Sequence, residues 1–154
     1  MENNKIITIT RICLIAILFC GLISCIYFYP TYILNNKLIN DSSKMYLIIF
    51  YEIISVPCFY LLFDFWSITN KMKNDDQFSY SVAKNIKKDS IILFTSSIVL
   101  LIGNIIFSII NINVLSLYNI VLVLIAFFAS IFLAILSYYI SKAAFLKEET
   151  DGLI

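Results

Sequence analysis

The sequence predicts an all-α integral membrane protein, a bundle of four transmembrane helices with its N- and C-termini on the cytoplasmic side. Three observations predict this fold class: the composition, four long apolar stretches, and the distribution of the basic residues. Hydrophobic residues make up 61% of the 154 residues and charged residues only 14%, whereas soluble domains carry about 25% charged residues. A soluble fold would expose large apolar patches to water, so the lipid bilayer is the solvent that suits this composition.

Four stretches are long and apolar enough to cross a bilayer, because a spanning helix needs about 20 mostly apolar residues. They cover residues 12–29, 45–68, 91–110 and 115–140. Backbone groups in lipid must find hydrogen-bond partners inside their own segment, so we expect each stretch to be a helix. Pro30 is expected to end the first helix. The short connection before residue 115 predicts an antiparallel hairpin of the last two helices, and the whole chain is expected to be a single transmembrane domain, residues 1–154.

The basic residues predict the orientation, because lysine and arginine are enriched in the cytoplasmic segments of membrane proteins. Nine of the eleven lie in the N-terminal segment, in the loop 69–90 or in the tail 141–154, and only Lys37 and Lys44 lie elsewhere. We therefore expect these three segments to face the cytoplasm, and the chain to be a multi-pass protein of the cell membrane. The lipid bilayer is then its first partner.

The N-terminal segment has one alternative interpretation. Its basic start and apolar core are also typical of a signal peptide, and residues 22–25 fit a loose bacterial lipoprotein cleavage pattern at Cys25. The residues that follow Cys25 are large and apolar, whereas a lipoprotein tether is small and polar at this point. The sequence therefore favours an uncleaved first helix without lipidation.

Several function classes lack their usual residues. The chain has no histidine, which removes the commonest general acid–base group and the commonest metal ligand. It also has no glycine-rich phosphate loop and no G-x-S-x-G motif. Cys13, Cys20, Cys25 and Cys58 lack the C-x-x-C spacing of a metal or redox site, and we expect them to be small buried hydrophobic side chains. We expect no enzyme, no metal and no cofactor, and the net charge of +1 gives no reason to expect direct binding of nucleic acid.

Glu52 is the most informative single residue. It lies about 10 Å inside the second span, where a carboxylate that faces lipid costs about 2–3 kcal/mol, so we expect it to point into the bundle. In the third span a largely polar stripe recurs at coiled-coil spacing: Ser97, Leu101, Asn104, Ser108 and Asn111. Asn104 lies at a similar depth, so Glu52 and Asn104 are expected to hydrogen-bond, as a structural contact between helices or as a proton or cation site.

Two other residues of the second span have structural interpretations. Asp64 lies near the inner end of the span and is expected to snorkel to the interface or to meet Thr95 or Ser96, with a lysine nearby to compensate its charge. Pro57 is expected to bend the helix, either as a simple bend that improves packing or as a hinge.

The last span carries a stripe of small residues. Ala126, Ser130 and Ala134 recur at every fourth position, which lets a neighbouring helix approach closely. We expect that neighbour to lie within the monomer, and a homo-oligomer face is the alternative.

The loop 69–90 carries the main cytoplasmic feature. Ser79 is expected to cap a helix that runs on into the third span, with Val82 and Ile86 on its apolar face. Its basic cluster is expected on the other faces: Lys84, Lys87 and Lys88. The cluster is interpreted as an anchor to anionic lipid headgroups or, alternatively, as a docking surface for a cytoplasmic partner.

Several short segments also occur in a familiar order: residues 55–60 (SVPCFY), 76–88 (DQFSYSVAKNIKK), 125–131 (IAFFASI) and 145–154 (FLKEETDGLI). Together they resemble a bacterial four-helix membrane family known only as a domain of unknown function (DUF 2975). Gln77 departs from the family pattern, which has Pro or Ala there, and Gly152 and Leu153 replace its Leu-Thr. Members of this family often lie beside a small helix-turn-helix regulator of the Cro/C1 type, so the resemblance implies a regulatory circuit with such a regulator as cytoplasmic partner.

Three functions are compatible with these features. The first is a regulatory or interaction protein that couples the membrane to a cytoplasmic partner. The second is a subunit of an ion-coupled transporter centred on Glu52, and the third is a self-immunity protein against a membrane-active peptide.

Overall fold

The computed structural model describes residues 2–35, 41–73, 79–109 and 117–151, and nearly all of them are helical. The elements are α1 (Glu2–Ile23), a π-helical turn η1 (Ser24–Phe28), α2 (Tyr29–Asn35), α3 (Asp41–Lys73), α4 (Tyr80–Ile109) and α5 (Leu117–Asp151). Among these residues, four helical segments are long and apolar enough to cross a membrane: Ile7–Asn35, Ser43–Lys71, Tyr80–Ile109 and Asn119–Thr150. The predicted all-helical chain with four helices of spanning length and composition is confirmed.

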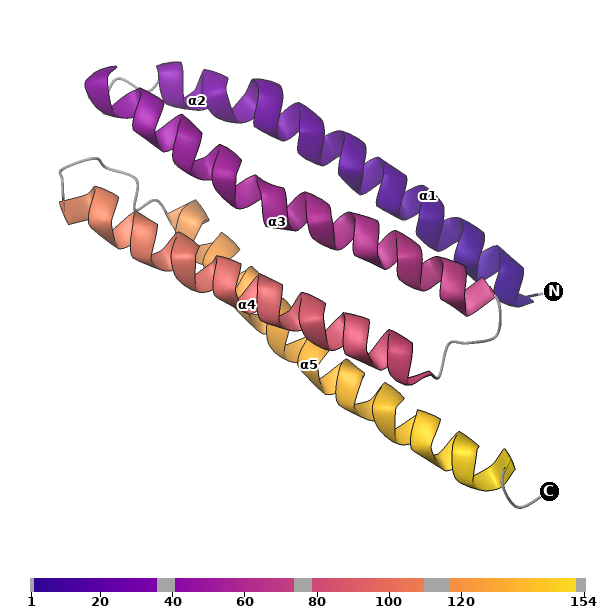
Figure 1. Cartoon of the computed structure of the whole chain (residues 1–154). Helices are drawn as coiled ribbons and strands as arrows, with labels where there is room; N and C mark the ends of the chain where they lie inside the picture. Colours follow the sequence, from indigo (N-terminus) through magenta and orange to yellow (C-terminus); the bar gives the residue numbers. More distant parts are fainter. Residues whose placement is uncertain (1, 36–40, 74–78, 110–116, 152–154) are drawn as a thin grey trace.

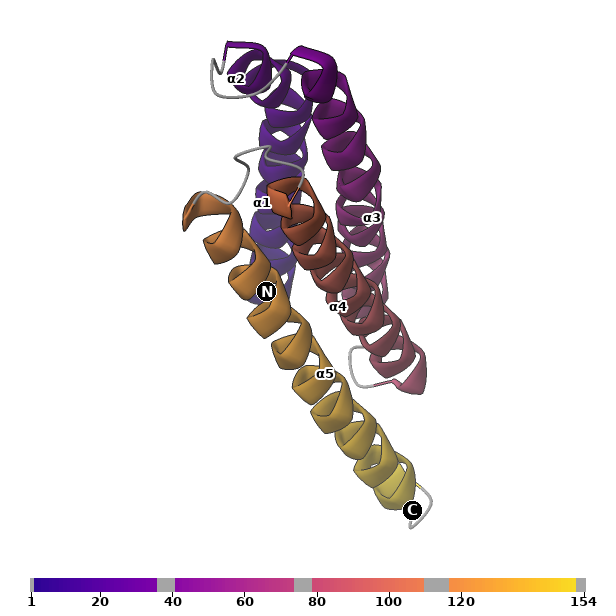
Figure 2. The same cartoon turned by 90° about the vertical axis from the view of Figure 1, so that its left-hand side faces the viewer.

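The long helices run antiparallel to their neighbours in the chain (Figure 1). The start of α1, the end of α3, the start of α4 and the end of α5 therefore lie at one end of the molecule, which we name the inner end, and the opposite end is the outer end. α1 packs on α3, α3 on α4 and α4 on α5, and no other pair of spanning helices makes more than marginal contact within the described residues. The helices thus pack in chain order, and α5 diverges from the others towards its C-terminal end (Figure 2).

The most extensive packing is between α4 and α5. Buried positions recur at spacings of three, four and seven residues along both helices, as in a coiled coil. They are Ala83, Ile86, Ser90, Ser97 and Asn104 on α4, and Asn119, Val123, Ser130, Leu133, Ser137 and Ala144 on α5. Several of these side chains are small, which allows close approach of helices in lipid. The Ser137 hydroxyl donates a 2.7 Å hydrogen bond to the backbone carbonyl of Ala83, and the predicted hairpin of the last two spans is confirmed.

The small-residue stripe expected on α5 lies only partly in this interface. Ser130 is buried and Ala126 is half-buried, but Ala134 is exposed. A coiled-coil contact repeats every 3.5 residues, so positions four residues apart rotate away from it. The small residue that brings α3 close to α4 is instead Gly103, because a Cβ at this position would overlap the ring of Phe50.

The first span differs from the prediction at Pro30, which does not end the helix. The chain passes from α1 through the π-helical turn η1 into α2, and Pro30 is the second residue of α2. A π-helical turn lies just before Pro30, and such a turn shifts the backbone hydrogen-bond pattern, so the missing N–H of the proline is accommodated without ending the helix. The helical segment consequently reaches Asn35.

The cysteines were expected to be buried, and this is wrong for most of them. Cys13, Cys20 and Cys58 are exposed on the surface of the chain, and Cys25 is half-buried. Because α1 packs mainly on α3, much of its apolar surface faces outward, and a thiol is apolar enough to lie on such a surface.

At the inner end the helices are longer than the apolar stretches that predicted them. α3 continues to Lys73 and α4 begins at Tyr80, so most of the expected loop 69–90 is helical. α5 continues to Asp151, so the expected tail 141–154 is a helix over most of its length. α3 also passes through Pro57 without a break, and a bend of the helix at this residue stays a prediction.

The start of α4 follows the prediction. The Ser79 hydroxyl accepts a hydrogen bond from the N–H of Val82, and its carbonyl accepts one from the N–H of Ala83, so Ser79 caps the helix. The apolar face of this first turn is buried in a cluster with α3 and α5, formed by Ile68, Val82, Ile86 and Leu133. The inner ends of α3, α4 and α5 are therefore packed together.

Candidate functional site

A buried polar cluster joins α3, α4 and α5 in the outer half of the molecule. The Tyr51 hydroxyl donates a hydrogen bond to Oδ1 of Asn104 at 2.9 Å and accepts one from Nδ2 of Asn119 at 3.0 Å. Asn104 is 4% exposed and Asn119 is 6% exposed. Hydrogen bonds of this kind hold helices together in lipid, so the cluster fixes three helices at one point.

Glu52 is not part of this cluster, and the predicted hydrogen bond between Glu52 and Asn104 is wrong. Successive residues of a helix point about 100° apart. Tyr51 occupies the inward position on α3, and its neighbour Glu52 is exposed. Asn104 does lie inside, as its depth predicted, but its partner is a phenol and not a carboxylate.

The other residues of the polar stripe on α4 differ in their burial. Ser97 is buried, and its hydroxyl donates to the carbonyl of Phe94 in the same helix at 2.7 Å. Ser108 is half-buried and Leu101 is exposed, while Asn111 lies outside the described residues. Within the described residues, the stripe therefore contributes one hydrogen bond between helices, that of Asn104.

A second buried polar site lies nearer the inner end, where Asp64 of α3 meets Asp89 of α4. The two carboxyl groups lie close enough for the charge of one to act on the other. Asp89 is 0% exposed, and Asp64 is half-buried. Among the described residues, no other group hydrogen-bonds to either carboxyl oxygen of Asp89 or to Oδ2 of Asp64. We name these two residues the carboxyl pair.

The partner of Asp64 therefore differs from the two expected ones. The Thr95 and Ser96 hydroxyls each donate to a backbone carbonyl one turn earlier in α4, at 2.8 Å. Such bonds to the preceding turn are common for hydroxyl side chains in helices, and they occupy both donors. Asp64 instead faces Asp89, which lies one to two helical turns closer to the inner end than Thr95 and Ser96.

The lysine expected near Asp64 is Lys88. Its ammonium group donates a hydrogen bond to the Tyr60 hydroxyl of α3 and lies 4.9 Å from the centre of the Tyr60 ring. Its positive charge also acts on Asp64 and Asp89. Although Lys88 is exposed, it is therefore held against α3.

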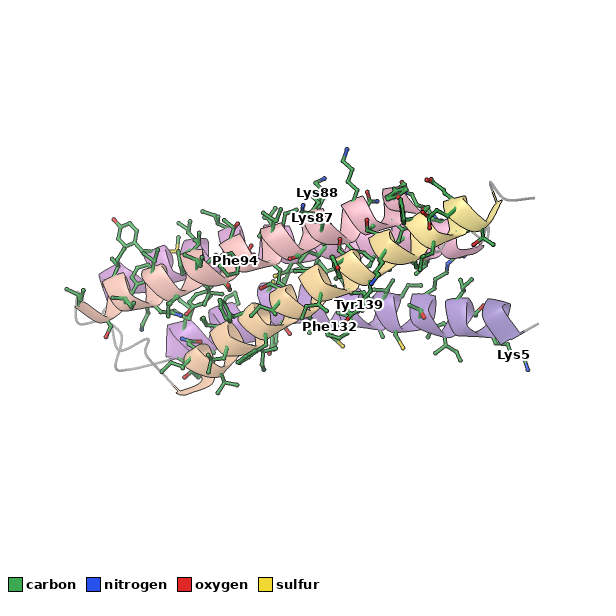
Figure 3. All side chains as sticks on the ribbon, turned by 90° about the horizontal axis from the view of Figure 1, so that it is seen from below. Lys5, Lys87, Lys88, Phe94, Phe132 and Tyr139 are labelled. Atoms are coloured by element: carbon green, nitrogen blue, oxygen red, sulfur yellow. The ribbon has the colours of Figure 1, made fainter. Side chains whose placement is uncertain are left out.

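The three lysines of the basic cluster thus differ in their contacts. Lys84 is exposed on α4, as are Lys87 and Lys88 (Figure 3). Of the three, Lys88 alone donates a hydrogen bond to Tyr60. If the cluster binds lipid headgroups or a partner, Lys84 and Lys87 are the residues that are free of this interhelical contact.

A third polar contact ties α1 to α3 at the inner end. The Arg11 guanidinium donates hydrogen bonds to the Thr69 hydroxyl and to Oδ1 of Asn70. It also lies 5.4 Å from the centre of the Trp66 ring, in cation–π range. The basic residue that helped to predict the orientation therefore also holds the first helix in place.

The three polar contacts do not form a metal site. Within the described residues, no group of three histidine, cysteine, aspartate or glutamate side chains could hold a metal ion. The chemistry that the arrangement can support is hydrogen bonding between helices and the binding of protons at carboxyl groups.

Sequence reasoning missed Tyr51, Asn119 and Asp89. Asp89 had a usable signal, because it lies four residues after Asn85 and seven after Val82, on the helix face that Val82 and Ile86 already marked as apolar and inward. It was overlooked because it follows two lysines and resembles part of a polar loop. Tyr51 carried no signal that distinguished it from the other aromatic residues of the span.

Comparisons of the chain with protein-family models, with curated proteins and with solved structures find no match in any of the three. The resemblance of the short segments to a family of unknown function therefore stays an expectation.

Proposed function

We propose that this chain is a small regulatory or interaction protein of the cell membrane, and that its inner end binds a cytoplasmic partner. The observation that carries the proposal is the last part of α5, residues 141–151, which continues the spanning helix beyond the apolar stretch. At the α-helical rise these eleven residues are about 16 Å long. This proposal takes both chain ends to face the cytoplasm, as the basic residues predict.

This segment is attached rigidly to the rest of the hairpin. Ser137 lies level with Ala83, to which it is hydrogen-bonded, so the residues after Ser137 run on past the start of α4 (Figure 2). Ala144 is buried, so packing continues well into the segment. A partner would meet a preformed helix and would not have to order a flexible tail.

The exposed side chains of the segment suit a protein surface. Phe145 is 51% exposed and Leu146 is 53% exposed. They are followed by exposed charged residues: Lys147, Glu148 and Glu149. Exposed apolar residues rimmed by charge are typical of binding surfaces, and a helix with such a face can dock into a groove of its partner. Lys84 and Lys87 offer a second, basic contact from α4.

The resemblance to the family of unknown function favours a small helix-turn-helix regulator as the partner. The ion-coupled transporter centred on Glu52 has less support, because Glu52 is exposed and does not meet Asn104. The self-immunity alternative stays a prediction.

Site-specific photocrosslinking in native membranes tests the proposal. A photoreactive residue placed at Phe145 should form an adduct with a soluble cytoplasmic protein, and neutral substitutions of Lys84 and Lys87 should weaken that adduct. The matched control is Phe132, which lies on the same helix inside the apolar stretch and is 65% exposed (Figure 3). From Phe132 we expect adducts with lipid. Adducts with lipid or with a second copy of the chain, and no other protein, from Phe145 would contradict the proposal.

A further inference from the structure

Among the described residues, the carboxyl pair is a buried ionisable site that the proposed docking function does not use. Asp89 is fully buried, and neither of its carboxyl oxygens has a hydrogen-bond partner among the described residues. An ionised carboxylate is only an acceptor, so two ionised carboxylates cannot form a hydrogen bond with each other. Buried polar groups are almost always hydrogen-bonded. A group that supplies a donor is therefore needed between Asp64 and Asp89.

We propose that Asp64 and Asp89 form a proton-binding site, in which the two carboxyl groups hold one proton between them. The protonated carboxyl donates to the ionised one, which pairs one carboxyl oxygen of each aspartate. Like charges this close cannot both stay ionised in a medium of low polarity, as in pairs of carboxyl groups that share a single proton.

The charges around the pair favour an occupant that carries a single positive charge. α4 contributes the Lys88 ammonium, whose charge acts on both carboxyl groups. With both aspartates ionised, the local charge is minus two from the pair and plus one from Lys88, which leaves minus one. One proton makes the site neutral, whereas a divalent cation would leave it positive. A cation would also need further oxygen ligands, and the described residues supply no third acidic or thiol group.

The other charged or titratable residues near the carboxyl pair do not change the net charge of the site. From α3, Tyr60 accepts the hydrogen bond of Lys88, and Lys71 donates to the Ser81 hydroxyl of α4. From α1, Arg11 is engaged with Thr69 and Asn70, more than one turn along α3 from Asp64.

From α5, the residues that pack on this part of α3 and α4 are uncharged: Leu133, Ser137 and Ile140. The tyrosines at the same level, Tyr138 and Tyr139, are exposed, and so is Lys142. Lys88 is therefore the one described basic residue whose charge acts on the pair.

The proton links the packing of α3 on α4 to pH. Loss of the proton would place two negative charges close together between the two helices and weaken their contact. The site is independent of the proposed docking surface on α5, so either can fail alone.

Infrared difference spectroscopy on the full-length protein in lipid nanodiscs tests the inference. The carbonyl stretch of a protonated carboxyl group is recorded at neutral pH for the unmodified chain and for Asp64→Asn and Asp89→Asn. We expect one such band, and we expect it to be lost in both variants, because the remaining carboxyl group then faces an amide and Lys88 and is ionised. Glu52→Gln, which alters an exposed carboxyl group on α3, is the matched control and should keep the band.

The unmodified chain gives a test that needs no variant. Labelling with aspartate that carries carbon-13 in its side-chain carboxyl should shift the band, and raising the pH should remove it. The inference is overturned if the unmodified chain has no such band, if either single variant keeps it, if labelled aspartate does not shift it, or if sodium or magnesium removes it at constant pH. The last result would identify a cation site.

Discussion

Replacement of Tyr51 by phenylalanine removes one hydroxyl group from the point where α3, α4 and α5 meet. That hydroxyl forms two hydrogen bonds between helices, with Asn104 and with Asn119. Hydrogen bonds between membrane helices contribute about 0.6–1.7 kcal/mol each. We therefore expect Tyr51→Phe to lower the free energy of unfolding by about 1–3 kcal/mol. Both asparagines are almost fully buried, so water cannot readily replace the lost partner, and the estimate is not reduced for solvation.

The assay is reversible unfolding of the purified protein in mixed micelles, in which a denaturing detergent is titrated against helix content. The matched control is Tyr46→Phe, because Tyr46 lies on the same helix and is 69% exposed. Its unfolding curve should coincide with that of the unmodified chain. The reasoning is refuted if Tyr51→Phe unfolds at the same detergent fraction as Tyr46→Phe.

The remaining predictions concern packing, an exposed carboxylate and a cation–π contact. Gly103→Ala should destabilise the protein by about 1–2 kcal/mol in the same titration, because overpacking against Phe50 costs more than the gain in helix propensity. Gly21→Ala should be neutral or slightly stabilising, because its Cβ would meet only an ordinary contact at 3.4 Å; equal losses in the two variants would contradict this. Glu52→Gln should change stability by less than about 0.5 kcal/mol, and a larger loss would show that the exposed carboxylate has a partner. Arg11→Ala should cost about 1 kcal/mol and change the fluorescence of the single tryptophan, which the Arg11 side chain covers; an unchanged emission spectrum would count against the contact.

The sequence was sufficient to predict where the helices lie along the chain. It was insufficient to predict which residues of neighbouring helices contact each other. Apolar length located all four helices that are long and apolar enough to cross a membrane, because such a helix needs a long apolar segment whatever its neighbours are. The Ser79 cap and the buried pair Val82 and Ile86 could also be predicted, since both depend on residues within one or two turns. These local rules do not specify which helix face meets which neighbour.

The errors concern contacts between helices or the rotation of a helix. Glu52 was expected inside because a carboxylate in lipid is costly, but the neighbouring Tyr51 occupies the inward position on α3. Pro30 was expected to end a helix, and the preceding π-helical turn allows the chain to continue. Asp89 was overlooked because it follows two lysines and resembles part of a polar loop. Depth along a helix could be read from the sequence, whereas rotation about its axis could not.

Topology mapping with reporter fusions tests the central claim most directly, because the docking surface needs both chain ends in the cytoplasm. Fusions of a reporter that is active only in the cytoplasm, and of one that is active only outside it, are placed at the N-terminus, at residues 36–40, 74–78 and 110–116, and at the C-terminus. We predict cytoplasmic activity at both ends and at 74–78, and external activity at 36–40 and 110–116. Cytoplasmic activity at all five positions, or opposite compartments for the two ends, would contradict a protein of four spanning helices with a cytoplasmic inner end.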